Sequence, residues 1–445
     1  MTVETATLGP LLENYANNVS PPSARAVRYG HRALLWRASE LKRVRHCGRV
    51  PRSNEDGVTL RIKDGFGGLA GLQHCGSVWS CPVCSARIRV HRALEIGSVL
   101  GRAVAAGHPL AFCTFTMAHH AGQTLDELWA AAQQAWRRTQ QGKAAQKDKK
   151  TVVGSVRVWE VTWGANGWHV HVHFVMVLRP GTTAAGLDEV AGGMYRRWSD
   201  GLTAAGLDAP QLVGQDWHLV EGDAAAEDLG GYLAKLADTE PDTAGLGLEL
   251  THSLPGRSAA GHATVAPFAL LGHLAATGET RALNLWHEWE RVSKGKRQIG
   301  WSAGLRDMFG PEVEELTDDE VVSAEVGSAF DDVCRWDAVQ WREFVAAPAR
   351  IVALLDAADT GGAAAAVALL DEWGVNYQLI GDKGHGNEKR SNGQGRTTAG
   401  SGGQGAELSR PGQSGTGDAG AVRRCDLPTS NEARHATGRV PLRRN

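Results

Sequence analysis

The segment from Trp168 to Met176, WHVHVHFVM, alternates polar and apolar residues. His169, His171 and His173 occupy the polar positions, with valines between them. In a β-strand this alternation sends all three imidazoles to one face and the valines to the other. Imidazole binds several divalent metals, so the pattern predicts a strand with a metal site on one face and a core on the other. A core strand with incidental histidines is the alternative, although three buried imidazoles are hard to satisfy together.

The residues before this strand predict a β-hairpin. The stretch from Val152 to Thr162 is rich in β-branched residues, and WGANGW joins it to the histidine strand. Asn-Gly is a strong hairpin signal, and a loop at this dipeptide would place Glu160 opposite His173. Any even-length loop centred nearby keeps Glu160 on the histidine face, because cross-strand partners share a face. Imidazoles and one carboxylate would leave coordination positions open, as a catalytic metal requires.

The remaining hydrophobic periodicity predicts helices and two more strands. Helical spacing occurs in residues 24–50, 87–107, 125–145 and 184–207, and strand alternation occurs in 110–117 and 216–221. Helices also dominate residues 251–309, and an alanine-rich helix follows within 311–375. These elements predict an α+β fold in which helices flank an antiparallel sheet.

The length and composition are those of a globular protein. The chain has 445 residues, of which 42% are hydrophobic and 22% charged, so about two or three domains are expected. By this reading no apolar run reaches the length needed to cross a bilayer, and the first residues, MTVETATLGP, lack a basic-then-apolar signal pattern. We therefore expect a cytoplasmic protein.

The net charge of −2 conceals an uneven distribution of charge. Residues 21–102 contain fifteen Lys or Arg against five acids, whereas residues 311–332 contain nine acids and no base. A locally basic segment suits contact with nucleic acid, and a solvated basic face is the alternative.

The later segment SKGKRQ, which lies between Trp286, Trp289 and Trp301, could likewise contact DNA by phosphate pairing and base stacking. Tryptophans that belong to a helical core are the alternative there.

The seven cysteines are clustered, and without a secretion signal they argue against a disulfide framework. A C-P-V-C pair can present two thiolates to one metal, and two upstream cysteines could complete a tetrahedral Zn²⁺ site. Inert, buried cysteines are the alternative. The four candidate ligands are Cys47, Cys75, Cys81 and Cys84, with His46 and His74 as alternative ligands.

A further candidate site lies in AAAEDLGGYLAKLAD. Asp228, Tyr232 and Lys235 are spaced at i, i+4 and i+7, which aligns them on one face of a helix. An ion pair between Asp228 and Lys235, beside a half-buried tyrosine, is the alternative interpretation.

The order of these motifs resembles the HUH endonuclease superfamily, and in particular the replication initiators of rolling-circle plasmids from Gram-positive bacteria. The resemblance rests on the strand with CTFT, on H-V-H followed by FVMV, and on the helix with Y-x-x-K. It covers roughly residues 45–310, because CGSVWSCPVC and RQIGWSAGLR also resemble segments of those initiators. The implied fold is an antiparallel sheet of the HUH type.

The resemblance implies that Tyr232 attacks a phosphodiester of a single-stranded origin loop. The products would be a 5′-phosphotyrosyl enzyme and a free 3′-hydroxyl that a polymerase extends. His171 and His173 match the metal-binding histidines of that family, while Glu160 is a further ligand inferred from the hairpin and His169 is a second candidate. Mg²⁺ or Mn²⁺ is the expected ion.

Two other residues of the tyrosine helix acquire roles from the same resemblance. Lys235 could lower the pKa of the phenol, ordinarily about 10, or stabilise charge on the phosphate. Asp228 stands where some plasmid initiators have a glutamate that assists the terminating cleavage, and Glu227 is its neighbour. The aspartate is shorter by one methylene, which matters for positioning a base.

These inferences divide the chain and define its function. We expect an N-terminal arm and basic helix (1–40), a basic cysteine-rich segment (41–105), a nicking domain (106–250), a helical C-terminal domain (251–380) and a disordered tail (381–445). The expected function is a site-specific DNA nicking and joining endonuclease that initiates plasmid replication. Because the sequence lacks a helicase P-loop, a host helicase would unwind the DNA.

Three other functions fit the same motifs. The first is a relaxase or transposase with the same chemistry. The second is a non-catalytic, zinc-dependent DNA-binding regulator in which the histidine strand is another structural metal site. The third is a metallohydrolase of a small substrate.

Overall fold

The computed structural model describes residues 23–220, 264–310, 316–323 and 330–380. All of these residues belong to one of the two units of the chain, Met1–Asn387, and the other unit is Glu388–Asn445. Three expectations lie outside the described residues: the N-terminal arm, the helix that bears Tyr232, and the tail after residue 380.

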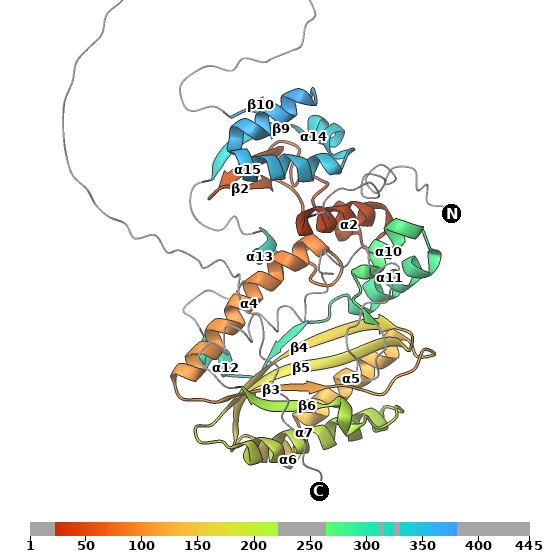
Figure 1. Cartoon of the computed structure of the whole chain (residues 1–445), viewed down its shortest axis with the longest axis vertical. Helices are drawn as coiled ribbons and strands as arrows, with labels where there is room; N and C mark the ends of the chain where they lie inside the picture. The colour runs from red at the N-terminus through yellow and green to blue at the C-terminus, as the bar shows by residue number, and fades with distance from the viewer. Residues whose placement is uncertain (1–22, 221–263, 311–315, 324–329, 381–445) are drawn as a thin grey trace, which may run out of the picture. The chain divides into compact units, whose positions relative to one another are not determined.

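A six-stranded antiparallel sheet forms the centre of the described fold (Figure 1). Its strand order is β6-β3-β5-β4-β7, and β8 also pairs with β4. The sequence analysis predicted β3 to β6 and missed β7 and β8, which are only two and three residues long. The strands are β3 (Leu110–Phe115), β4 (Val152–Gly164), β5 (Gly167–Leu178), β6 (Asp216–Val220), β7 (Thr264–Val265) and β8 (Ile299–Trp301).

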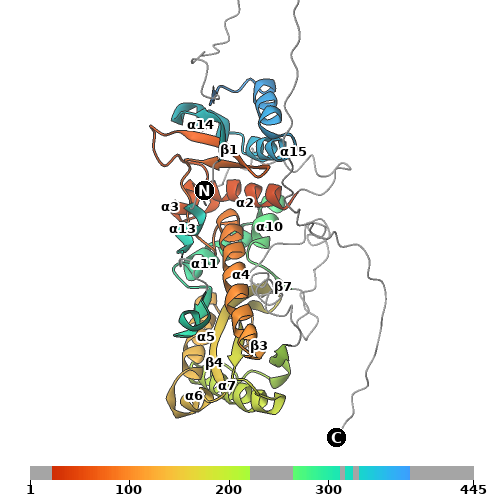
Figure 2. The ribbon, with the colours of Figure 1, turned by 90° about the vertical axis from the view of Figure 1, so that its left-hand side faces the viewer.

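Helices pack on both faces of this sheet, and β5 is apolar on both sides after His173. On one face Phe174 contacts Trp136 of α5 edge to face and lies in the same core as Trp198 of α7. On the other face Val175 packs with Leu100 of α4. The helices concerned are α4 (Pro82–Ala105), α5 (Leu125–Thr139), α7 (Ala184–Ala204) and α12 (Leu305–Phe309), and α4 is the long orange helix of Figures 1 and 2.

The helices predicted within the described residues are present, but two of them are divided. The helix expected over residues 125–145 ends at Thr139, and a second helix, α6 (Gly142–Asp148), begins at Gly142, which has a φ of +84°. The start of α5 is fixed by a capping box between Thr124 and Glu127. The helix expected over 24–50 is likewise divided at Ser39, into α2 (Ala24–Ala38) and α3 (Lys42–His46).

A smaller antiparallel sheet has the strand order β10-β9-β1-β2. Figure 1 shows its red-orange and blue strands together, so it joins segments from the two ends of the described chain. The helical C-terminal region therefore also contributes strands, which the sequence analysis did not predict. The elements are β1 (Val58–Lys63), β2 (Phe66–Ala70), β9 (Asp331–Trp336), β10 (Gln378–Leu379), α14 (Ala338–Val345) and α15 (Ala349–Glu372).

The core of this smaller layer contains aromatic and aliphatic side chains. Trp336 and Leu60 are fully buried beside Trp341 and Phe344 of α14.

Helix α15 is the one helix in the described part of the chain that is long and apolar enough to cross a membrane, which corrects the expectation that no run reaches that length. Gly362 interrupts α15 with non-helical angles, and Leu354 packs into the core.

Four further elements complete the description. They are the 3₁₀ turn η1 (Leu212–Gly214) and the helices α10 (Ala269–Thr277), α11 (Thr280–Ser293) and α13 (Asp318–Ser323). Trp286 and Trp289 of α11 are buried core residues, whereas Trp301 of β8 is half-buried. Two of the three tryptophans near the basic segment SKGKRQ are therefore core residues, as the alternative interpretation of the sequence expected.

Candidate functional site

The β4–β5 hairpin brings Glu160 directly opposite His171. The prediction that Glu160 faces His173 is wrong by two residues, because the loop consists of Ala165 and Asn166. An Asn-Gly loop of the expected type needs positive φ at both central residues. Gly167 has a φ of +84°, but the only non-glycine residue with positive φ in the described part of the chain is Asp64.

The shift in the loop leaves Glu160 on the histidine face, as predicted from the even length of the loop. One carboxylate oxygen, Oε2 of Glu160, lies 2.7 Å from Nε2 of His171 and 2.7 Å from Nε2 of His173. Both imidazoles are buried, and the Glu160 side chain is 19% exposed. The three donor atoms lie within 4.8 Å of one another, so they could hold one metal ion.

Neighbouring strands fix the orientation of His173. The hydroxyl of Thr114 on β3 lies 2.9 Å from Nδ1 of His173, and the ring of Phe112 stacks against the imidazole. Nδ1 of His171 is buried and has no hydrogen-bond partner among the described residues. The Nε2 atoms of both rings therefore point to the carboxylate, where a cation would be held.

The charges of this cluster favour a bound cation. Burial raises the pKa of Glu160, but the charge of His171 and hydrogen bonds from both imidazoles outweigh it and hold that pKa well below its usual range. Burial lowers the pKa of His173, which favours the neutral, metal-binding form of the ring. An ionised carboxylate with imidazole nitrogens is a donor set that suits a divalent metal and leaves coordination positions open.

His169 is beside this cluster but is not one of its three converging donors. Its ring stacks on His119 with centroids 4.6 Å apart, and it lies edge to face with His171. Burial lowers the pKa of His169 to about 2. His119, which follows β3 and which the sequence analysis did not include in the site, thus extends the row of imidazoles.

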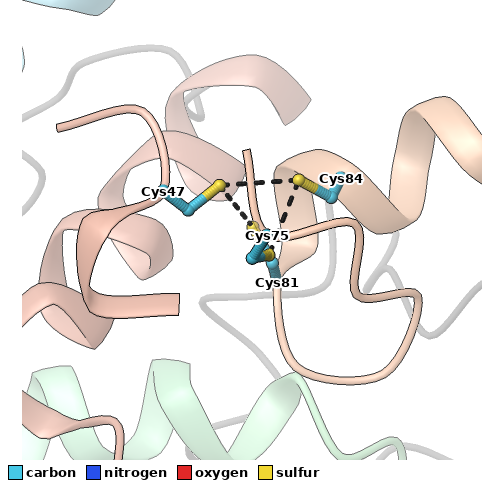
Figure 3. A group of neighbouring side chains, drawn as sticks. All are labelled: Cys47, Cys75, Cys81 and Cys84. Atoms are coloured by element: carbon cyan, nitrogen blue, oxygen red, sulfur yellow. Dashed lines mark hydrogen bonds between the residues drawn. The ribbon is translucent and has the colours of Figure 1, made fainter. Parts of the chain in front are cut away.

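A second group of potential ligands is formed by four buried cysteines (Figure 3). Cys47 follows α3, Cys75 lies in the next loop, and Cys81 and Cys84 are at the start of α4. Sγ of Cys47 lies 3.5 Å from that of Cys84 and 3.7 Å from that of Cys81, while Cys75 lies 3.7 Å from Cys84. All four sulfurs converge within 4.8 Å, so they could bind one metal tetrahedrally.

The four clustered thiols share hydrogen bonds, and their pKa values shift in opposite directions, down for Cys47 and Cys84 and up for Cys75 and Cys81. Hydrogen bonds from Cys75, and then from Cys81 and Cys84, hold the pKa of the Cys47 thiol well below its usual range. Burial lowers the pKa of His74, but hydrogen bonds with Cys47 and Cys84 outweigh it and raise that pKa above its ordinary value. His74 therefore contacts the cluster as a hydrogen-bonding neighbour, and neither it nor His46 is among the four converging donors.

The proposed tyrosine helix cannot be compared with these clusters, because Asp228, Tyr232 and Lys235 lie outside the described residues. Tyr195, the next candidate nucleophile, lies on α7. Its hydroxyl donates a hydrogen bond of 2.7 Å to the carbonyl oxygen of Pro210 and thus has a structural partner.

Comparison with known proteins gives a consistent result. Residues 68–184 match the Rep_1 family, described as a replication protein. The chain is 29% identical over 312 residues to "Protein rep" of Streptomyces lividans, an alignment that covers 57% of this chain and 67% of that protein. It is also 28% identical over 173 residues to a "Neomycin resistance protein" of Streptomyces cyanogenus, covering 33% of this chain and 40% of that protein. No solved structure matches.

The chain therefore carries a replication-protein domain, and its resemblance to plasmid replication initiators is confirmed. The matched residues include α4 and the strands β3, β4 and β5. They thus contain Glu160, His171, His173 and three of the four clustered cysteines. These similarities support plasmid replication initiation as the general function.

Proposed function

We propose that this protein initiates rolling-circle replication by cutting and rejoining one DNA strand at a specific site in a plasmid origin. The observation that carries the proposal is the convergence of Glu160, His171 and His173 on one face of the replication-protein domain. Two buried imidazoles that direct their Nε2 atoms to one oxygen of a half-buried carboxylate form a donor set that suits a divalent metal.

Glu160, His171 and His173 would hold a divalent cation, Mg²⁺ or Mn²⁺, with His169 as a neighbouring candidate ligand. When bound, the cation would polarise the oxygens of the scissile phosphate and favour their developing charge. Thr114 orients His173 through its hydrogen bond, and the ring of Phe112 helps to limit access of water to the buried side of the imidazole.

Tyr232 is the proposed nucleophile. Its phenolic oxygen forms a bond to phosphorus while the bond from phosphorus to the 3′-oxygen breaks, and the phenolic proton ends on the departing 3′-hydroxyl, directly or through water. The products are a 5′-phosphotyrosyl protein and a primer end. Lys235 would stabilise the phenolate, and Asp228 or Glu227 would assist the terminating cleavage.

The four clustered cysteines would bind Zn²⁺ as a structural site. Four sulfur ligands leave no open position for a substrate, which is typical of structural zinc. The ion would join α3 to the start of α4 and so hold the basic N-terminal segment against the sheet domain.

The proposal implies partners in the cytoplasm, where plasmid DNA is found. The single-stranded or hairpin origin is the substrate, a host helicase unwinds the duplex and a host polymerase extends the free 3′-hydroxyl. A self-association of the initiator is compatible with the sequence but is not required by this chemistry.

The test is incubation of the full chain with labelled single-stranded origin DNA and Mn²⁺, followed by denaturing electrophoresis. We expect a covalent protein–DNA adduct that Tyr232→Phe abolishes while DNA binding remains. Tyr195→Phe is the matched control and should retain the adduct, because that hydroxyl bonds to Pro210. Persistence of the adduct in Tyr232→Phe would reassign the nucleophile, and no adduct with the wild-type chain would favour a non-catalytic regulator.

A further inference from the structure

A cavity of about 960 Å³ lies between α3, the loop before α4, and the segment that leads into β8. Its lining is strongly basic, and Asp318 is the one acidic side chain among the described residues that line it. Half-buried Trp301 supplies an aromatic wall. The basic lining residues are Lys42, Arg43, Arg92, Lys294, Lys296, Arg297 and Arg306.

The cations of this cavity differ in whether a carboxylate neutralises them. On the α3 and α4 side, Arg43 pairs with Asp319 at 2.6 Å, and Arg92 pairs with Asp318 at 2.8 Å. On the β8 side, Lys294 and Arg297 are exposed and have no carboxylate partner in the described part of the chain. The segment before β8 therefore carries the uncompensated positive charge.

A half-buried arginine near this segment adds to the excess of positive charge. Arg157 on β4 packs against Gly300, where an added Cβ would lie 2.9 Å from the guanidinium. Its Nη1 is buried without a hydrogen-bond partner among the described residues. Burial, and then the charge of Arg297, lower the pKa of Arg157 to about 10. An anion bound at this edge would relieve the repulsion between the two guanidinium groups.

The floor of the cavity contains a buried amide with an unused acceptor. Gln298 is 7% exposed, lines the cavity and has an Oε1 atom without a hydrogen-bond partner among the described residues. Its backbone is held firmly, because its carbonyl oxygen accepts a hydrogen bond of 3.0 Å from the Trp159 N–H. Two residues earlier, the Lys296 carbonyl oxygen accepts a hydrogen bond of 2.7 Å from the Trp79 indole. An unpaired buried amide is costly, so this side chain is suited to a ligand that brings a polar edge.

The same backbone contact joins the cavity to the candidate metal centre. Trp159, which holds Gln298, is the residue next to Glu160 on β4. The cavity therefore adjoins the strand that carries Glu160. In a duplex the base edges lie within the grooves. In a single strand an unstacked base can turn its hydrogen-bonding edge toward a buried amide.

We propose that this cavity binds single-stranded DNA, with Lys294 and Arg297 contacting phosphates and Gln298 hydrogen-bonding the edge of an unstacked base. The inference rests on the proposed function only in taking DNA as the ligand. Trp301 provides a surface for stacking of a neighbouring base, and phosphate contacts position the strand without selecting its sequence.

The test measures binding of the full chain to a labelled oligothymidylate by fluorescence anisotropy, over a range of salt concentrations and without added divalent metal. Lys294→Gln and Arg297→Gln remove exposed charges, so they should fold normally. We expect each to weaken binding severalfold and to reduce the salt slope by about 0.7, as for loss of one single-strand phosphate contact. Gln298→Leu should weaken binding about two- to tenfold with the salt slope unchanged.

Arg342→Gln is the matched control, because Arg342 is exposed on α14 and does not line the cavity. Unchanged affinity in Lys294→Gln and Arg297→Gln, or an equal loss in Arg342→Gln, would overturn the proposal. Tighter binding of a matched duplex, with the same dependence on these residues, would overturn the preference for a single strand. Oligothymidylate has no nick site, so the outcome does not depend on whether Tyr232 cleaves DNA.

Discussion

The hydroxyl of Thr114 lies 2.9 Å from Nδ1 of His173, on the side of the ring opposite the atom that faces Glu160. Such a contact fixes the direction of a metal-binding imidazole, and its loss typically lowers metal affinity about 10- to 100-fold. We expect Thr114→Val, which keeps the side-chain shape, to weaken Mn²⁺ binding by about tenfold or more. Titration calorimetry of the full chain with Mn²⁺ measures this directly.

Thr162→Val is the matched control for that substitution. Thr162 lies opposite His169, and its hydroxyl is buried without a hydrogen-bond partner among the described residues. Its removal should leave Mn²⁺ affinity unchanged and should not lower the free energy of unfolding. Equal effects of the two substitutions would mean that the hydroxyl of Thr114 does not orient the ligand.

The cysteine cluster predicts one zinc ion per chain. We expect Cys84→Ser to lose that ion, because a serine hydroxyl does not ionise at neutral pH to replace the thiolate. Zinc-finger peptides derive roughly 10–16 kcal/mol from structural zinc, so a clear decrease in the thermal unfolding midpoint should accompany the loss. Elemental analysis of the purified chain gives the zinc content.

Cys113→Ala is the control for general damage at a buried cysteine. Cys113 is buried on β3, where burial raises the pKa of its thiol and keeps it neutral. This variant should retain zinc and lose only the stability expected of a small cavity. Full zinc content in Cys84→Ser would exclude the four-thiolate site.

His31 predicts a pH dependence of stability that is independent of both clusters. Burial in α2 lowers its pKa from 6.5 to about 4. The unfolded chain therefore binds more protons than the folded chain between these values, so stability is highest above pH 6.5 and decreases as the pH falls toward 4. The difference amounts to about 3 kcal/mol at most.

His31→Leu should flatten this dependence, because leucine does not titrate. Urea unfolding of both proteins at several pH values between 4 and 6.5 is the measurement, over the window set by His31. A wild-type profile that His31→Leu leaves unaltered would show that other groups cause the acid sensitivity.

Gly167 controls the loop that positions the histidine strand. It has a φ of +84°, and an added Cβ would lie 3.0 Å from Cα of Ala121. Left-handed geometry costs an L-residue roughly 1–2 kcal/mol, and the close contact adds to that cost. Gly206→Ala is the matched control, because Gly206 has a φ of +86° and open space around it. Chemical unfolding should show a larger loss for Gly167→Ala, and equal losses would mean that the Ala121 contact is easily relieved.

The histidine strand shows how far local sequence reasoning extends. Alternation along Trp168 to Met176 was sufficient to predict that the imidazoles share a face, because side-chain direction in a strand repeats every two residues. The same rule placed Glu160 on that face. The pairing partner was wrong, since it depends on the backbone angles of Asn166, which the sequence does not specify uniquely.

The sequence by itself determined the main strands and helices, the two groups of potential metal ligands and the family resemblance, because periodicity and residue spacing act over a few neighbouring positions. Only the tertiary structure decided that Thr114 contacts His173, that β9 pairs with β1, and that Gln298 lies buried in a cavity lined by basic residues. Those relationships join residues far apart in the chain, and their formation depends on how whole elements pack, which no local pattern records.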